Sequence, residues 1–251
     1  MVNDLFSIKD KVIVITGSNQ GIGKILAENM QKKGGIIYRI DKKFSKSKKI
    51  EDRIFDKVCD VTNLKQIKNV CDEIFNENKK IDVLINNAGI TLPGKPESYS
   101  LNSWVKTLEV NLTGSFQVSL EVLKHMKRKR RGSIINITSI NAEFGFPNNP
   151  AYVASKGGLK LLGKSLARDW GIYGIRINNL GPGYIITKMT QKSFSNKKTR
   201  IARQNNTMLN RWGKPEDLVG PCIFLASDAS SYVTGQDIYV DGGWSANGLQ
   251  L

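Results

Sequence analysis

The fold is indicated most directly by residues 12–23, which read VIVITGSNQGIG. A short β-branched run at residues 12–16 leads straight into a turn that contains Gly17, Gly21 and Gly23. The apolar residues that follow recur at helical spacing, at Ile22, Ile25, Leu26 and Met30, before two glycines at 34 and 35 end the pattern. A strand that turns through glycines into a helix is the first half of a βαβ unit.

The alternation of strand-like and helix-like patterns continues along the chain. Short, β-rich apolar runs lie at residues 12–16, 36–40, 81–85, 133–138, 175–180 and 237–240. Helical patterns cover residues 64–76, 101–126, 152–170 and 215–226, the last with a proline in its first turn. Such alternation is typical of parallel sheets, and 251 residues fit one α/β domain. We therefore predict a single doubly wound, Rossmann-type α/β domain over residues 1–251, its mainly parallel sheet flanked by helices on both faces.

The composition is that of a globular protein, with 40% hydrophobic and 24% charged residues. No apolar run approaches the roughly 20 residues of a membrane span, and residues 1–10 lack the regions of a signal peptide. We therefore expect a cytoplasmic protein without a membrane partner. The net charge of +16 is compatible with nucleic acid, an anionic substrate or a generally basic proteome. Because no aromatic residues interleave the basic run 124–131, we interpret it as a solvated helix end and expect no nucleic-acid partner.

Histidine and cysteine usage argues against several kinds of active site. His125 is the one histidine of the chain, so a multi-histidine zinc site cannot be built, a Ser-His-Asp triad is strongly disfavoured, and we expect no metal. The three cysteines, Cys59, Cys71 and Cys222, show no C-x-x-C spacing. Their odd number favours reduced, structural thiols over a disulfide framework.

The turn after the first strand has the chemistry of a phosphate-binding loop. Glycines permit sharp bends and the close approach of a pyrophosphate, while the start of the helix offers free backbone N–H groups and positive potential. The spacing G-x-x-x-G-x-G departs from the commoner G-x-G-x-x-G, and an ordinary strand-to-helix turn is the alternative. On the phosphate-binding interpretation, the residues that contact a dinucleotide are Gly17, Ser18, Asn19, Gln20, Gly21, Ile22 and Gly23.

Asp41 ends the second strand about twenty residues beyond the glycines, where a carboxylate can bind the ribose hydroxyls of a dinucleotide. A carboxylate repels the 2′-phosphate of NADP, so Asp41 predicts that NAD(H) is preferred and NADP(H) is the less favoured cofactor. Lys42 and Lys43 follow immediately and weaken that inference. Asp60, with Val61, lies after a third strand that is not among the apolar runs above, where its carboxylate can bond the adenine amino group or, equally, cap the next helix.

The sequence Asn-Asn-Ala-Gly at residues 86–89 closes the fourth strand, at the carboxyl edge of the sheet where ligands of open α/β sheets bind. Asparagine-rich loops are often simple turns. Here the small side chains allow the backbone to approach the cofactor ribose, so Asn87, Ala88 and Gly89 belong to the predicted cofactor site.

A proton donor for hydride chemistry is sought in the pattern Tyr-x-x-x-Lys, because an ammonium beside a phenol lowers the pKa of that phenol toward neutrality. The pattern occurs three times, at Tyr38 and Lys42, at Tyr152 and Lys156, and at Tyr184 and Lys188. The first pair lies along and beyond a strand, about 13 Å apart, and the third lies in a loop. Only Tyr152 and Lys156 open a helical pattern that puts both on one face. Ser139, after the strand 133–138, lies at the same sheet edge, where its hydroxyl can orient a substrate oxygen or cap the strand end.

Together these motifs resemble the short-chain dehydrogenase/reductase family over essentially the whole chain and in the family's order. The resemblance implies that Tyr152 exchanges the hydroxyl proton, that Lys156 lowers the tyrosine pKa and holds the cofactor ribose, and that Ser139 steadies the reacting oxygen. It also implies that Asn111 breaks a helix and holds a water in a proton relay. The positions that match the segment contacting the nicotinamide carboxamide are Pro182, Gly183, Ile185 and Thr187.

Within the family, residues 211–221 and 240–244 look most like the branch of gluconate 5-dehydrogenases and deoxy-keto-gluconate dehydrogenases, although packing and subunit contacts can also explain this segment. The resemblance thus implies hydride transfer between nicotinamide and a secondary alcohol or ketone of a sugar acid or related polyol. Family members usually form tetramers through the helices that match residues 101–126 and 152–170, so we expect a homotetramer. The polar, basic and irregular stretch 187–211 is predicted to be a substrate lid, with Lys188, Lys192 and Arg211 available for an anionic substrate.

Two rival functions stay open. A 3-oxoacyl carrier-protein reductase would share the catalytic residues, and its acidic partner would also suit a basic surface. Asp41 argues mildly against it, because such reductases usually take NADPH. A non-catalytic NAD(H)-binding sensor would share the fold, but its expected mark is a broken catalytic set, and here the set is intact.

Overall fold

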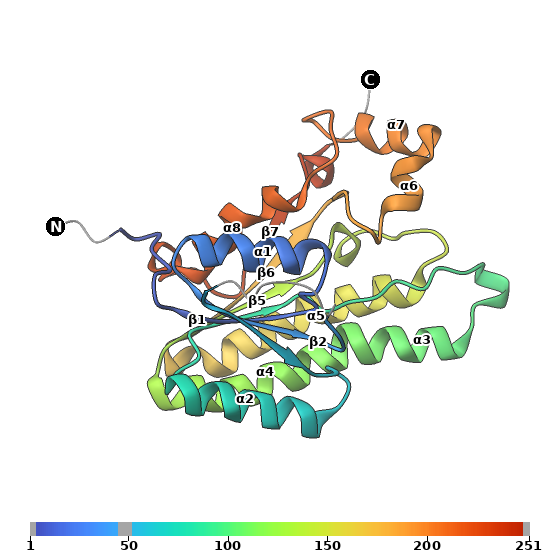
Figure 1. Cartoon of the computed structure of the whole chain (residues 1–251). Coiled ribbons are helices and arrows are strands. Elements are labelled where there is room, and N and C mark those ends of the chain that lie inside the picture. The colour runs from blue at the N-terminus through green and yellow to red at the C-terminus, as the bar shows by residue number, and fades with distance from the viewer. Residues whose placement is uncertain (1–3, 45–51, 248–251) are drawn as a thin grey trace.

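The computed structural model describes residues 4–44 and 52–247 (Figure 1). Its middle layer is a sheet in which the described residues form seven strands, in the order β3-β2-β1-β4-β5-β6-β7, with every pairing parallel. The strands are β1 (Val12–Thr16), β2 (Ile36–Asp41), β3 (Ile54–Val58), β4 (Val83–Asn86), β5 (Gly132–Ile137), β6 (Ile175–Pro182) and β7 (Asp237–Val240). The predicted parallel α/β sheet is therefore confirmed.

Helices cover both faces of this sheet. The helices are α1 (Gly21–Lys32), α2 (Leu64–Asn78), α3 (Leu101–Leu108), α4 (Ser115–Lys129), α5 (Pro150–Trp170), α6 (Gln191–Ser195), α7 (Lys197–Asn205) and α8 (Val219–Ala226). Figure 1 shows α1 and α8 on one face and α2 and α4 on the other. Along β1, Val12 and Val14 pack in the core on the α2 side, whereas Ile13 and Ile15 pack in the core on the α1 side. Both faces of β1 are buried, which explains its continuous apolar run.

The strand order places a crevice at the carboxyl edge of the sheet. β1 has β2 on one side and β4 on the other, so the chain winds away from β1 in opposite directions. The loops that follow β1 and β4 therefore separate at this point, which is where open α/β sheets bind ligands. Among the helices of the described residues, none is long and apolar enough to cross a membrane.

The single helix predicted over residues 101–126 is wrong in one respect. α3 ends at Leu108, a π-helical turn occupies Glu109–Gly114, and α4 begins at Ser115. Asn111 lies in the π turn and is fully buried. The helix break that the family resemblance implies at Asn111 is present.

Two further expectations need correction. The stretch 187–211, expected to be irregular, contains α6 and α7, which Figure 1 shows apart from the sheet. Neither helix has a buried residue, so neither carries the apolar pattern by which a helix is recognised.

The helix predicted over 215–226 starts with a 3-10 turn at Pro215–Leu218 before α8 begins. β3 is an edge strand in which only Ile54 is buried, and it therefore lacks an apolar run.

A ladder of polar side chains crosses the sheet near its carboxyl edge. Asn86 on β4, Asn136 on β5, Asn179 on β6 and Asp237 on β7 are successive register partners. The Nδ2 of Asn86 donates to Oδ1 of Asn136 (2.9 Å), and the Nδ2 of Asn136 donates to Oδ1 of Asn179 (3.0 Å). The Nδ2 of Asn179 in turn donates to Oδ1 of Asp237 (2.7 Å). The ladder links four strands beneath the crevice.

Candidate active site

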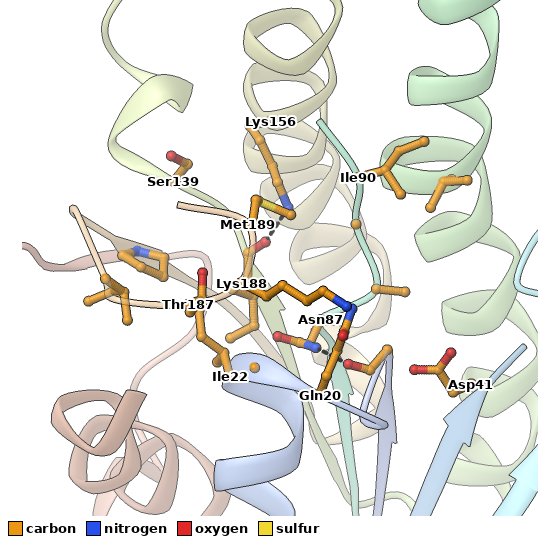
Figure 2. A pocket seen from close by; sticks show the side chains of 18 of the residues that line it. Gln20, Ile22, Asp41, Asn87, Ile90, Ser139, Lys156, Thr187, Lys188 and Met189 are labelled. Atoms are coloured by element: carbon orange, nitrogen blue, oxygen red, sulfur yellow. Dashed lines mark hydrogen bonds between the residues drawn. The ribbon is translucent and has the colours of Figure 1, made fainter. Parts of the chain in front are cut away.

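A cavity of about 330 Å³ lies at the carboxyl edge of the sheet (Figure 2). It brings together residues from the ends of six strands and the segments that follow them. Of the residues predicted from the sequence, those that line it are Gly17, Gln20, Gly21, Ile22, Asp41, Val61, Asn87, Ala88, Gly89, Ser139, Tyr152, Lys156, Pro182, Gly183, Ile185 and Thr187. A shared site for cofactor and substrate requires that such distant segments meet in one cavity.

Five predicted residues do not line the cavity, and most of them contact the segments that do. The buried Ser18 hydroxyl donates to the carbonyl of Ile15 (2.8 Å). A side chain at Gly23 would meet the carbonyl of Gly17 at 2.6 Å, so this glycine allows close packing of the turn. Asn19, Asp60 and Asn111 make the contacts described below.

The glycine turn has the backbone geometry that an anion-binding loop requires. Gly17 has a φ of 64°, and a Cβ there would lie 2.6 Å from the Cα of Ala88, so only glycine permits this approach of the β1 and β4 loops. Gly21 has a φ of 60°, and a Cβ there would meet no protein atom within 4 Å. The N-cap of α1, Gln20, makes no side-chain capping bond, and the first turn has no acidic residue. Backbone N–H groups thus remain available for the phosphates of a dinucleotide.

Asn87 ties the β4 loop to the β1 loop. Its Nδ2 donates to the carbonyls of Thr16 (2.9 Å) and Gly17 (2.8 Å). In return, the Thr16 hydroxyl accepts hydrogen bonds from the backbone N–H groups of Asn87 (3.0 Å) and Ala88 (3.1 Å). The two walls of the crevice are therefore held at a fixed separation.

The end of β2 carries two opposed charges that reach the cavity. Asp41 lines it, and its Oδ2 accepts a hydrogen bond from the backbone N–H of Asn19 (3.0 Å). Lys42 also lines it, but its ammonium is paired with Oδ2 of Asp60 at 2.7 Å. The other Asp60 oxygen accepts from the N–H (2.9 Å) and hydroxyl (2.8 Å) of Thr62. Both oxygens of Asp60 thus have protein partners, and the pairing with Lys42 was not visible in the sequence.

The residues predicted to handle the proton meet in the same cavity. Tyr152 and Lys156 lie one turn apart on α5, and the Lys156 Nζ is 5.7 Å from the centre of the Tyr152 ring. Ser139 follows β5, accepts a hydrogen bond from the backbone N–H of Asn141 (3.1 Å), and is hydrogen-bonded to Tyr152. By contrast, the hydroxyl of Tyr38 donates to Glu77 (2.6 Å), which removes that tyrosine from consideration.

The expected lowering of the Tyr152 pKa by Lys156 is not seen. Burial raises the pKa of Tyr152 above its ordinary value, and the bond with Ser139 opposes this rise only in part. The Lys156 ammonium is itself buried and donates to the carbonyl of Ile137 (2.7 Å), so its contact with the tyrosine is through the ring and not the hydroxyl. Burial also lowers the pKa of Lys156 to about 8.

Asn111 holds the catalytic helix against the β4 loop. In the π turn its Oδ1 accepts from the N–H of Ile90 (2.8 Å), while its Nδ2 donates to the carbonyl of Ile90 (3.0 Å) and to the hydroxyl of Ser155 (3.0 Å). Ser155 is the neighbour of Lys156 on α5. The side chain of Asn111 is therefore a positioning clamp, and π turns commonly mark such functional sites.

Several lining residues were missed or misplaced by sequence reasoning. The hydrophobic residues Ile90 and Met189 line the cavity, and only their position beside the recognised motifs could have indicated it. Lys188, expected to face the substrate, runs across the cavity toward Gln20 and the glycine turn (Figure 2). Arg211, another expected substrate ligand, is instead paired with Asp217 through two hydrogen bonds of 2.8 and 2.9 Å.

Comparison with known proteins agrees with this geometry. A family model described as enoyl-(acyl carrier protein) reductase matches residues 17–245. The chain is 35% identical to gluconate 5-dehydrogenase of Gluconobacter oxydans, over 96% of each chain. It is 36% identical to 2-dehydro-3-deoxy-D-gluconate 5-dehydrogenase of Bacillus subtilis, over 97% of this chain and 98% of the relative. It is also 35% identical to a 3-oxoacyl-(acyl-carrier-protein) reductase of Thermotoga maritima, over 94% of this chain and 98% of the relative.

Solved structures give the same result. A gluconate 5-dehydrogenase from Burkholderia cenocepacia, in complex with NADP and tartrate, has a TM-score of 0.90 at 33% identity and covers 97% of this chain and 98% of its own. Such relatives are dehydrogenases and reductases that act on hydroxyl or keto groups, and the motifs resemble the same class. This chain is accordingly an oxidoreductase that binds a nicotinamide cofactor, and it belongs to the short-chain dehydrogenase/reductase family.

Proposed function

We propose that this protein is an NAD(H)-dependent oxidoreductase that moves a hydride between nicotinamide and a secondary alcohol or ketone of a sugar acid or related polyol. The observation that carries the proposal is that Ser139, Tyr152 and Lys156 line the same cavity as the glycine turn. A hydride carrier and a proton donor can then act on one substrate carbon and its oxygen.

Each residue of this set has a separate task. When bound, the cofactor donates or accepts the hydride. Tyr152 gives a proton to the substrate oxygen during reduction and removes it during oxidation. Ser139 steadies the same oxygen through its hydroxyl, and Lys156 holds the cofactor ribose. Asn111 keeps the β4 loop and α5 in register, and in this proposal it also anchors the water of the proton relay.

The direction of the pKa shifts favours an acid role for Tyr152 at neutral pH. Because burial raises its pKa, the hydroxyl keeps its proton and can deliver it to a developing alkoxide. Oxidation needs the phenolate instead. The bond with Ser139 lowers the pKa of Tyr152 toward that form, whereas the positive charge of Lys156 contacts the ring. Since the pKa of Lys156 is lowered to about 8, this charge is present at neutral pH and is lost as the pH rises through that value.

The preference for NAD(H) is supported by the end of β2. Asp41 faces the cavity with its carboxylate, and Lys42, which could attract a 2′-phosphate, is paired with Asp60. The remaining cofactor contacts proposed are those of Ser18, Asn19, Gly23 and the lining residues already named. The Burkholderia relative was solved with NADP, so the test of this preference compares both cofactors in this protein.

The substrate class is proposed from the relatives that act on gluconate derivatives, and the Thermotoga relative keeps a carrier-protein substrate as the second candidate. The deciding experiment follows NADH absorbance with sugar acids, polyols and hydroxyacyl thioesters, using wild type and Tyr152→Phe. We expect turnover of a sugar acid by wild type and a loss of roughly 10²- to 10⁴-fold in the variant, with NADH binding retained. Tyr38→Phe, from the unused Tyr-x-x-x-Lys pair, is the matched control. Turnover of thioesters alone would select the rival, and no turnover at all would favour a sensor.

The domain organisation, the assembly and the cellular setting are also proposed. One sheet joins the described residues, which supports a single domain with residues 187–211 as a lid over the substrate. We propose a homotetramer because four large apolar side chains on α3, α4 and α5 face solvent, namely Leu101, Val105, Phe116 and Leu161. The free, buried cysteines 59, 71 and 222 support a reducing, cytoplasmic setting.

A further inference from the structure

A wall of aromatic residues adjoins the cavity at Tyr184, and its rings lie outside the cavity lining. It is contributed by the loop after β5, the end of β6, α6, the segment after α7 and the C-terminal turn. Its ring contacts connect Phe144 to Trp244 (5.1 Å), Trp244 to Tyr184 (6.1 Å), Tyr184 to Trp212 (5.5 Å) and Trp212 to Phe194 (5.2 Å). Tyr184 lies between Gly183 and Ile185, both of which line the cavity, so the wall begins at its rim.

One cation is embedded in this wall. The guanidinium of Arg203, on α7, lies 4.4 Å from the centre of the Tyr184 ring, 5.4 Å from that of Phe146 and 5.8 Å from that of Trp212. Phe146 belongs to the loop that joins Ser139 to the helix of Tyr152. Arg203 is thus held between the segment that carries the catalytic hydroxyls and the segment that follows β6.

The guanidinium of Arg203 has aromatic contacts but, in the part of the chain that the structure describes, neither a carboxylate partner nor a hydrogen-bond acceptor. Its positive charge also opposes the rise that burial causes in the pKa of Tyr184. The other basic residues offered for an anionic substrate differ: Arg211 is neutralised by Asp217, and Lys188 extends toward the glycine turn. Lys192 lies on α6, outside the cavity lining. Arg203 is therefore the one of these four cations that aromatic rings hold without a counter-ion among the described residues.

We propose that Arg203 binds the carboxylate of the substrate and makes the enzyme select a sugar acid over a neutral polyol. Aromatic rings favour a cation over their faces and leave the edge N–H groups of a guanidinium free. Those donors match a carboxylate in a bidentate arrangement. The assignment rests on the proposed function, since it supplies an anion-binding group for the part of a sugar-acid substrate that extends past the rim of the cavity at Tyr184.

The test compares an aldonate with the neutral polyol of the same chain length in wild type, Arg203→Met, Arg203→Lys and Arg200→Met. Arg200→Met is the matched control, because Arg200 lies on the same helix and, of the rings in residues 4–44 and 52–247, contacts that of Phe194 alone (5.6 Å). We expect Arg203→Met to lose roughly 10- to 100-fold in kcat/KM for the aldonate, mainly through KM, while the polyol changes little. Arg203→Lys should recover part of this loss, since it keeps the charge but not the paired N–H donors of the guanidinium.

Binding of NADH, measured by fluorescence titration, should be unchanged in all variants and shows that the cofactor site is intact. If Arg203→Met keeps the preference of wild type for the aldonate, or loses both substrates equally, the assignment of Arg203 is wrong and the proposed function stands. If wild type turns over no sugar acid, the proposed function fails, and the assignment falls with it.

Discussion

Lys156 carries its charge in a buried position, where a charge is unfavourable. The residue is 4% exposed, and its ammonium donates to one carbonyl, that of Ile137. Burial lowers the pKa of Lys156 from 10.5 to about 8, which corresponds to a penalty on the charged form of about 3 kcal/mol. The roles proposed for Lys156 in catalysis and cofactor binding, and not stability, would explain a lysine at this position.

Replacing this lysine should make the protein inactive but more stable. We expect Lys156→Met to raise the free energy of unfolding at pH 7 by up to about 3 kcal/mol, less what the lost hydrogen bond contributed. The penalty is complete below the folded pKa of about 8 and is relieved between that value and the ordinary 10.5. Urea unfolding at pH 7 and pH 10 should therefore show that the difference in free energy of unfolding between Lys156→Met and wild type is smaller at the higher pH. A variant less stable than wild type at pH 7 would contradict this.

We expect cofactor choice to depend on three side chains at the end of β2 and in the loop after β3, namely Asp41, Lys42 and Asp60. Asp41→Ser should weaken NAD and remove the repulsion of a 2′-phosphate, while Asp60→Asn should release Lys42 to attract it. Charge-assisted bonds contribute roughly 1.5 to 3 kcal/mol, so wild type should prefer NAD by at least about tenfold in kcat/KM. Each variant should shrink that preference.

The measurement is kcat/KM for both cofactors at low ionic strength in wild type, Asp41→Ser, Asp60→Asn and the double variant. Lys43→Met is a control, because this exposed neighbour does not line the cavity. A wild type that prefers NADP would show that the carboxylate of Asp41 does not govern the choice.

At the scale of elements, the proposed lid segment begins with a cation, Lys188, that lines the proposed cofactor cavity. Lys188 follows Thr187 and crosses the cavity toward Gln20, where the uncapped start of α1 also lies (Figure 2). Its ammonium has no ion-pair partner among the described residues. Binding of the cofactor pyrophosphate there would draw the start of the lid onto the cavity.

We expect Lys188→Met to raise the Kd of NADH by roughly fivefold at low salt, since an exposed ion pair contributes about 1 kcal/mol or less. Lys192→Met removes a charge from α6 outside the cavity and should leave the Kd unchanged. Fluorescence titration at two ionic strengths checks this, and the effect should shrink at high salt. An equal effect of both variants would mean that only the net charge matters.

Elements with a strong local pattern could be predicted, and those fixed by tertiary contacts could not. β1 and β7 have the predicted bounds, because their apolar runs sit between clear turn signals. α6 and α7 could not be predicted, because their polar sequences carry no buried face. The cavity at the strand ends followed from the motifs, but the pairing of Lys42 with Asp60 depends on loops that meet only in the folded chain.

At the scale of the whole molecule, an apolar surface suggests where subunits meet. Leu101 is 74% exposed and Leu161 is 65% exposed, on α3 and α5. Exposed side chains of this size on helices next to the catalytic residues are costly for a monomer in water. Their burial between copies would also brace α5, which carries Tyr152 and Lys156.

Leu161→Lys should therefore dissociate the proposed tetramer and lower activity together. Size-exclusion chromatography with light scattering measures the assembly, and turnover across a dilution series measures the link to activity. Ile172→Lys is the matched control, because Ile172 is 71% exposed but lies beyond the end of α5. A wild type that is monomeric at micromolar concentration would contradict the expectation.

The polar ladder across the sheet has a direction. A carboxylate only accepts, so Asp237 forces the amide of Asn179 to present Nδ2 to it and Oδ1 to Asn136. The same constraint passes to Asn136 and then to Asn86, whose own Oδ1 is left without a partner among the described residues. One side chain on the last strand thus sets the orientation of three amides, and their dipoles all align from β4 toward β7.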